Sequence, residues 1–207
     1  DFSLLYVFEH SSRSLRNAYA LTAFWAGQEG SLLLWTWLLA LSTLAVVWRN
    51  RRNAPDLSSG ATFVLMANTA FFLGLLNFTS DPFRPFPGPT PADGYGLNPL
   101  LQNPGMVIHP PLLFMGYAGL TVPFAFALAS LLAGRRDSLW IRKTRSWTLI
   151  SWFLLGAGIL LGAQWAYVEL GWGGYWAWDP VENASLLPWL TSTAFLHSSI
   201  VQDWRDS

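Results

Sequence analysis

Residues 112–133 read LLFMGYAGLTVPFAFALASLLA and contain no charged side chain. A helix crosses the hydrocarbon core of a bilayer with about 20 mainly apolar residues, because each residue adds about 1.5 Å of length. Four more apolar stretches of similar length occur, each bounded by proline, glycine or charge. The five predicted spans are residues 31–48, 61–78, 112–133, 147–168 and 184–201. The sequence therefore predicts an all-α polytopic membrane protein with about five transmembrane helices.

The composition of the whole chain agrees with this class. Of the 207 residues, 52% are hydrophobic and 12% are charged, whereas an average soluble domain has about 25% charged residues. The formal net charge is zero, so membrane lipid is an expected partner and nucleic acid is not. The chain has no cysteine, which excludes disulfides and thiolate metal sites and leaves histidine as the only strong transition-metal ligand. The three histidines are His10, His109 and His197.

Lysine and arginine are unevenly distributed about the predicted spans. Nine of the twelve follow the first, third and fifth spans: Arg49, Arg51, Arg52, Arg135, Arg136, Arg142, Lys143, Arg145 and Arg205. By the positive-inside rule these links face the cytoplasm. The proline-rich and glycine-rich residues 79–110, predicted to form an irregular loop, and the tryptophan-rich loop of residues 169–183 are then extracytoplasmic.

The chain begins at Asp1 rather than at a methionine and stops shortly after the last predicted span. We therefore expect residues 1–207 to form a single transmembrane domain that is a piece of a larger helical bundle.

The tryptophan-rich loop contains the sequence WGGYWAWDPVEN at residues 172–183. Its aromatic rings suit a flat, largely apolar partner such as a porphyrin, although tryptophan and tyrosine also gather at membrane interfaces as anchors. The pair Gly173 and Gly174 and the turn at Asp179 favour a shaped binding surface, since an anchoring belt requires neither. Asp179 is also predicted to cap the following helix, with Glu182 in the first turn of that helix.

Two of the histidines are candidate ligands. His197 lies near the middle of the fifth span, where an imidazole either bonds a neighbouring helix or ligates a metal such as heme iron. It lies about 20 Å from the outer edge, so it would serve a second heme rather than one at the loop. His109 precedes Pro110, and a residue before proline is disfavoured in the α region. We expect His109 to be presented from a stiffened backbone at the mouth of the third span, or to be a solvated loop histidine.

Four segments carry a resemblance to a known family. The stretch Trp172, Gly173, Gly174, Tyr175, Trp176, Ala177, Trp178 and Asp179 resembles the signature of the WWD family of heme-handling proteins. Residues 28–35 (QEGSLLLW), 97–119 (LNPLLQNPGMVIHPPLLFMGYAG) and 179–190 (DPVENASLLPWL) look like the cytochrome c maturation protein F branch of that family. The resemblance covers nearly the whole chain.

The resemblance implies a heme lyase subunit in the bacterial inner membrane, with the tryptophan-rich loop on the periplasmic side. Heme arrives on a periplasmic heme chaperone and is attached to the CxxCH cysteines of an apocytochrome c, which other subunits keep as thiols. Substrate heme would lie on the loop, with Trp172, Trp176, Trp178 and Asp179 positioning it for reaction and Gly173, Gly174 and Tyr175 completing the surface.

The resemblance also implies a role for each of the two candidate histidines. His109 would be an axial ligand to the iron of the substrate heme, and His197 would ligate a resident b-type heme. In the family each is paired with a second histidine further along the chain, beyond Ser207.

Two other functions remain open at the level of sequence. A heme exporter would need charged groups along a path through the membrane, and the spans carry almost none besides Glu169. A non-catalytic docking subunit would use the aromatic loop to bind a protein partner.

Overall fold

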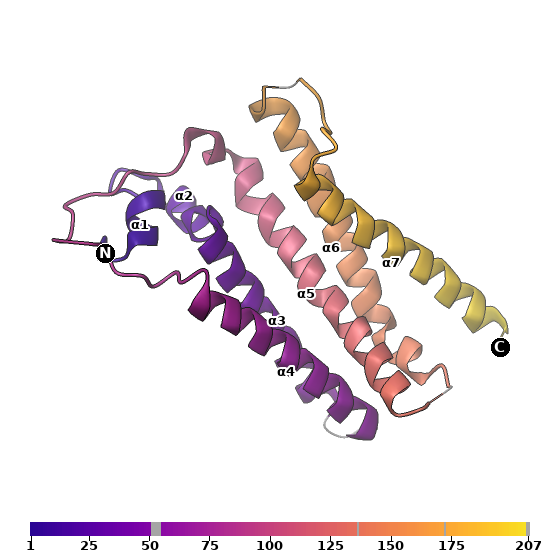
Figure 1. Cartoon of the computed structure of the whole chain (residues 1–207). Coiled ribbons are helices and arrows are strands. Elements are labelled where there is room, and N and C mark those ends of the chain that lie inside the picture. The colour runs from indigo at the N-terminus through magenta and orange to yellow at the C-terminus, as the bar shows by residue number, and fades with distance from the viewer. Residues whose placement is uncertain (51–54, 136, 172, 206–207) are drawn as a thin grey trace.

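A computed structural model describes residues 1–50, 55–135, 137–171 and 173–205. They form a helical bundle (Figure 1), and in these ranges the only strand-like pairing is a single antiparallel bridge between Leu4 and Pro85. The α-helices are α1 (Leu5–His10), α2 (Asn17–Thr22), α3 (Gln28–Asn50), α4 (Pro55–Phe78), α5 (Pro104–Leu132), α6 (Leu139–Glu169) and α7 (Pro180–Arg205), and the short 3₁₀ helices are η1 (Ala23–Trp25) and η2 (Pro99–Leu101). The predicted all-α class is confirmed.

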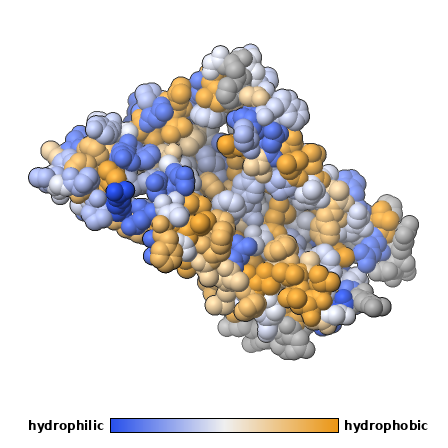
Figure 2. Space-filling view, viewed as in Figure 1, coloured by the Kyte–Doolittle hydropathy of each residue, from blue (hydrophilic) through white to orange (hydrophobic). Residues whose placement is uncertain are grey.

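Four of the described helices are long and apolar enough to cross a membrane: α3, α4 from Leu57, α5 and α6. The fifth predicted span also forms a helix, α7, but α7 is not among these four. Serine and threonine residues and His197 interrupt its apolar sequence, which lowers its hydropathy. Hydrophobic residues cover much of the helical surface, whereas the N-terminal part is more hydrophilic (Figure 2).

The long helices alternate in direction. Figure 1 shows the last turn of α3, the first turn of α4 and the α5–α6 junction at one end of the bundle and the α6–α7 loop at the opposite end. The basic residues beside the two junctions, including Arg49, Arg135 and Arg142, therefore lie together at the end away from the tryptophan-rich loop. This arrangement agrees with the alternation of basic and non-basic links in the sequence.

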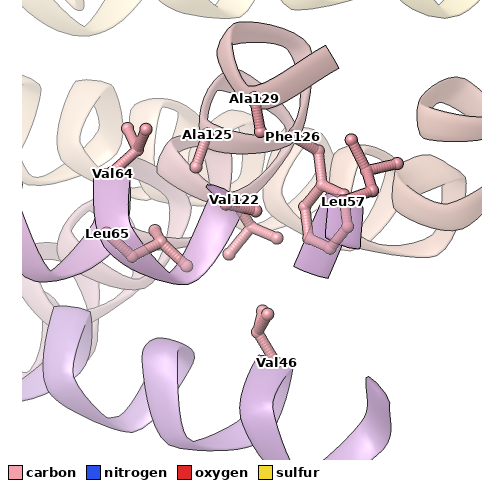
Figure 3. Close-up of a cluster of buried hydrophobic side chains, with 9 residues drawn as sticks. Val46, Leu57, Val64, Leu65, Val122, Ala125, Phe126 and Ala129 are labelled. Atoms are coloured by element: carbon pink, nitrogen blue, oxygen red, sulfur yellow. The ribbon is translucent and has the colours of Figure 1, made fainter. Parts of the chain in front are cut away.

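The largest buried cluster joins α3, α4 and α5 (Figure 3). It contains Val46, Leu57, Ala61, Val64, Leu65, Val122, Ala125, Phe126 and Ala129. Next to this cluster, α5 and α6 approach each other closely, because a glycine of each helix lies opposite a leucine of the other. A Cβ atom on Gly116 would lie 2.7 Å from Leu155, and one on Gly158 would lie 2.8 Å from Leu113. Small residues that allow such contact favour helix association in lipid, where van der Waals packing replaces the hydrophobic effect.

The predicted irregular loop of residues 79–110 ends instead at Asn103, where α5 begins. Asn103 caps α5, its side-chain oxygen accepting a hydrogen bond from the backbone N–H of Gly105 at 2.7 Å, and Pro104 is suited to the first helical position. Pro110 lies inside α5 and cannot donate to the carbonyl of Met106. The indole Nε1 of Trp25 donates to that carbonyl instead, at 3.1 Å.

His109 is therefore a helical residue, and the prediction that Pro110 holds it out of the α conformation is wrong. The preference of a residue before proline for extended backbone is statistical. Here the capping of α5 by Asn103 and the hydrogen bond from Trp25 outweigh it.

The N-terminal helices pack over the N-terminal end of α3. The hydroxyl of Tyr6 donates to the carbonyl oxygens of Ala23 and Phe24 at 3.1 and 3.2 Å and accepts from the N–H of Gly27 at 3.0 Å. Burial raises the pKa of Tyr6 to about 12. His10 stacks on the same ring with 4.4 Å between ring centroids, so His10 belongs to this structural contact.

Candidate functional site

His109 lies in the second turn of α5 and faces α6. Its Nδ1 is 2.7 Å from the carbonyl oxygen of Gly158. A carbonyl only accepts hydrogen bonds, so Nδ1 carries the proton and the neutral imidazole keeps a lone pair on Nε2. The ring lies nearly parallel to Trp165, with centroids 6.4 Å apart. A Cβ atom on Gly162 would collide with the imidazole ring, so this glycine makes the space that the ring occupies.

The tryptophan-rich loop connects α6 to α7, and its described residues are 170, 171 and 173–179. Trp172 lies outside the described residues. Trp178 has a φ of 59°, in the left-handed region that a bulky residue rarely adopts, and Gly173 has a φ of 70°. Such backbone geometry persists only where surrounding contacts hold it.

Two side chains from the first turn of α7 hold the backbone around Trp178. The carboxylate of Glu182 accepts a hydrogen bond from the N–H of Ala177 at 2.8 Å. The side-chain amide of Asn183 donates to the carbonyl of Trp178 at 3.0 Å. Asp179 caps α7, because its Oδ1 accepts from the N–H of Glu182 at 2.7 Å. The predicted cap and the predicted place of Glu182 are thus both confirmed.

The aromatic rings of the loop do not form one flat surface. Trp176 and Trp178 meet edge to face, at 6.0 Å and 81°, so a planar ligand can lie parallel to only one of them. Tyr175 stacks on Tyr167 of α6 at 4.3 Å and 9°. Trp178 is 70% exposed and Tyr175 57% exposed. These two side chains are the aromatic groups that the described loop offers to a partner.

Trp176 has a different environment from Trp178. Its indole Nε1 is buried and has no hydrogen-bond partner in the described structure. A buried donor without a partner is costly. This N–H is therefore a candidate contact for a polar group of a ligand.

A cavity of about 120 Å³ is lined both by His109 and by residues of the tryptophan-rich loop, the two parts of the predicted site. It is lined by His109, Leu113, Ile159, Gly162, Ala163, Trp165, Ala166, Leu170, Trp176, Asp179, Val181, Glu182 and Ser185. Pockets that enclose drug-sized ligands measure about 300–1,000 Å³. The cavity is therefore too small to enclose a porphyrin, which would lie over its mouth or enter it by an edge.

His197 lies elsewhere, about 25 Å along α7 from Pro180. It is exposed, and its Nδ1 is 2.8 Å from the carbonyl of Thr193 in the same helix. The predicted bond to a neighbouring helix is therefore absent among the described residues. Because the carbonyl fixes the proton on Nδ1, Nε2 is the nitrogen that remains free for a ligand.

The described residues hold no group of three His, Cys, Asp or Glu side chains that could bind a metal ion.

Sequence reasoning missed the residues that position the site. Gly158 and Gly162 receive the imidazole of His109, and Asn183 fixes the carbonyl of Trp178. The spacing of the two glycines, GILLG, is the small-residue pattern typical of close helix contact in membranes, so this part of the site was open to prediction. The role of Asn183 depends on the loop conformation, which no local pattern specifies.

Comparison with known proteins identifies the family. Residues 25–207 match the family model described as cytochrome C assembly protein. The chain is 48% identical to the cytochrome c-type biogenesis protein CcmF of Haemophilus influenzae, over 100% of this chain and 32% of that relative. It is 50% identical to CcmF of Pseudomonas aeruginosa (99% of this chain, 31% of the relative) and to CcmF of Escherichia coli (100% and 32%).

The chain thus spans about a third of the length of these curated relatives. No solved structure matches it. On the family match and these identities, the chain belongs to the cytochrome c assembly protein family and is a CcmF-type cytochrome c biogenesis protein.

Proposed function

We propose that this chain forms the heme-holding part of a heme lyase on the periplasmic side of the bacterial inner membrane. The observation that supports this most strongly is the shared cavity, where His109 from α5 meets Trp176 and Asp179 from the tryptophan-rich loop. The free Nε2 of His109 suits axial ligation of the iron in a substrate heme.

The exposed rings of Trp178 and Tyr175 offer apolar faces to the substrate porphyrin beside this cavity. The N–H of Trp176, which has no partner among the described residues, is suited to donate a hydrogen bond to a polar group of the porphyrin. Trp172, Gly173 and Gly174 complete the proposed surface. With the iron held by one imidazole and the ring by the aromatic faces, each vinyl group is presented in one orientation.

The reaction we propose is addition of a cysteine thiol across a vinyl group. A carbon–sulfur bond forms, the proton of the thiol passes to the other vinyl carbon, and no net oxidation or reduction takes place. The proposed thiols are those of the CxxCH motif of apocytochrome c. Orienting two reactants contributes to rate by converting a bimolecular encounter into a positioned one. A periplasmic heme chaperone and the thiol-handling subunits are the further proposed partners.

We further propose that His197 ligates a resident b-type heme, which would supply electrons to keep the substrate iron reduced. The free Nε2 of His197 fits this role. His10 packs against Tyr6 and Gly27, and His109 lines the cavity beside the loop, so we assign neither of them as the second axial ligand.

The test is heme attachment to a CxxCH reporter by the full-length protein. His109→Ala is expected to lower attachment about 100-fold, since loss of alignment at a reacting centre has effects of this size. The matched control is His10→Ala, which removes a histidine outside the proposed site. Equal attachment in both variants would refute the role of His109. If only His197→Ala loses the b-type absorption, the role of His197 is distinct from that of His109.

A further inference from the structure

A hollow of about 450 Å³ lies between α3 and α4 at the end of the bundle far from the tryptophan-rich loop. It is lined by Val47, Asn50, Ser58, Ser59, Thr62, Phe63 and Met66. None of these residues belongs to the heme site proposed above.

Ser58 is the most unusual residue of this hollow. Its side chain is 7% exposed, and its hydroxyl is buried without a hydrogen-bond partner in the described part of the chain. Buried polar groups in folded proteins normally have a partner. Other helical hydroxyls here follow that rule, since Thr62 bonds the carbonyl of Ser58 at 2.8 Å. The hydroxyl of Ser58 therefore indicates a polar ligand in the hollow.

Two features beside the hollow attract an anion. The hollow lies beside the first turns of α4, a helix of 24 residues whose N-terminus carries partial positive charge. Lys143 Nζ donates to the side-chain oxygen of Asn50 at 3.4 Å, which places a cation beside the rim. Arg49 is the neighbour of Asn50 in the sequence.

The rest of the hollow is apolar and continues along the helices toward the middle of the bundle. Val47, Phe63 and Met66 are 41%, 73% and 60% exposed. Phe63 lies one turn beyond Ser59 and Met66 one turn beyond Thr62, so the hollow passes from hydroxyl groups to an apolar wall along α4. A phospholipid has the same order, with a phosphate at one end and acyl chains at the other.

We propose that this hollow binds an anionic phospholipid. The phosphate accepts hydrogen bonds from the hydroxyls of Ser58 and Ser59, near the cationic group of Lys143. One acyl chain lies against Phe63 and Met66. The site is independent of the proposed heme chemistry.

The experiment uses the full-length protein, delipidated in detergent, with lipid affinity measured from the shift of the thermal unfolding midpoint and by native mass spectrometry. Phosphatidylglycerol is expected to bind several-fold more tightly than phosphatidylethanolamine because of the nearby ammonium group of Lys143. Ser58→Ala is expected to weaken phosphatidylglycerol binding about ten-fold, since it removes a hydrogen bond to a charged group. Ser59→Trp, at an exposed position on the rim, should weaken it by blocking the hollow.

Ser192→Ala is the matched control. Ser192 is also 7% exposed, but its hydroxyl already bonds the carbonyl of Trp189 at 2.9 Å. This variant should bind phosphatidylglycerol as the unchanged protein does. Circular dichroism checks that each variant is folded.

Three results would overturn the proposal. Unchanged phosphatidylglycerol affinity in both Ser58→Ala and Ser59→Trp would show that the hollow is not the site. Equal affinity for the two lipids would exclude selection for an anionic headgroup. Competition by inorganic phosphate at the concentration of the lipid would assign the hollow to free phosphate instead.

Discussion

Trp178 combines an exposed ring with a left-handed backbone, a conformation that costs a residue with a Cβ atom about 1–2 kcal/mol. The sequence predicted the cap formed by Asp179, which the structure confirms, whereas the binding role predicted from the aromatic residues of the loop stays a prediction. The sequence did not predict the perpendicular packing of Trp176 and Trp178. The backbone around these rings is held by a hydrogen bond that Glu182 accepts from Ala177 and one that Asn183 donates to Trp178, and both form only once the loop has folded back on α7.

At this scale we predict that Asn183→Ala lowers heme attachment while leaving the b-type absorption unchanged, because the carbonyl of Trp178 loses its donor. The free energy of unfolding should fall by about 1 kcal/mol, the usual net contribution of one hydrogen bond. Reporter attachment and thermal unfolding measure the two effects. Asn77→Ala is the control, since the exposed side chain of Asn77 donates to the carbonyl of Leu73 within α4. Equal loss of attachment in the two variants would contradict a specific role for Asn183.

The helices show which sequence rules hold and which do not. Hydropathy predicted all five long helices, because about 20 apolar residues have few alternatives in lipid. The start of α5 was placed too late, since the prolines and the NPG sequence were interpreted as loop. In the structure Asn103 caps the helix and Trp25, distant in sequence, bonds the carbonyl that Pro110 leaves open. A tertiary hydrogen bond of this kind leaves no local pattern.

The α5–α6 contact provides a prediction at the scale of elements. A Cβ atom on Gly162 would collide with the ring of His109, so Gly162→Ala should displace the imidazole and lower heme attachment. The strain of overpacking should also reduce the free energy of unfolding by about 1–3 kcal/mol. The control is Gly74→Ala, because a Cβ atom there meets no other atom within 4 Å. Normal attachment by Gly162→Ala would show that the close fit around His109 has no functional role.

In the whole molecule, the basic junctions and the tryptophan-rich loop lie at opposite ends (Figure 1). The alternation of charge predicted this separation, because each long helix reverses the direction of the chain. The lateral arrangement of the helices could not be predicted in the same way. It follows from the buried cluster of α3, α4 and α5 and from the glycines between α5 and α6.

The absence of cysteine in this chain makes the proposed orientation directly measurable. In a background without other accessible cysteines, a membrane-impermeant maleimide should label Ala92→Cys in spheroplasts and should leave Asp137→Cys unlabelled until the cells are lysed. Residue 92 lies in the α4–α5 loop, and Asp137 lies in the α5–α6 junction, where it pairs with Arg135. Labelling of Asp137→Cys in intact spheroplasts would reverse the proposed orientation.

The most direct measurement of the proposed heme site is the absorption spectrum of substrate heme added to the full-length protein, recorded as a difference against the same protein without added heme. If His109 ligates the iron through Nε2, His109→Gly should lose the low-spin spectrum, and exogenous imidazole should restore both that spectrum and attachment to the CxxCH reporter. A low-spin spectrum that persists in His109→Gly without imidazole, together with normal attachment, would contradict the proposal that His109 holds the heme.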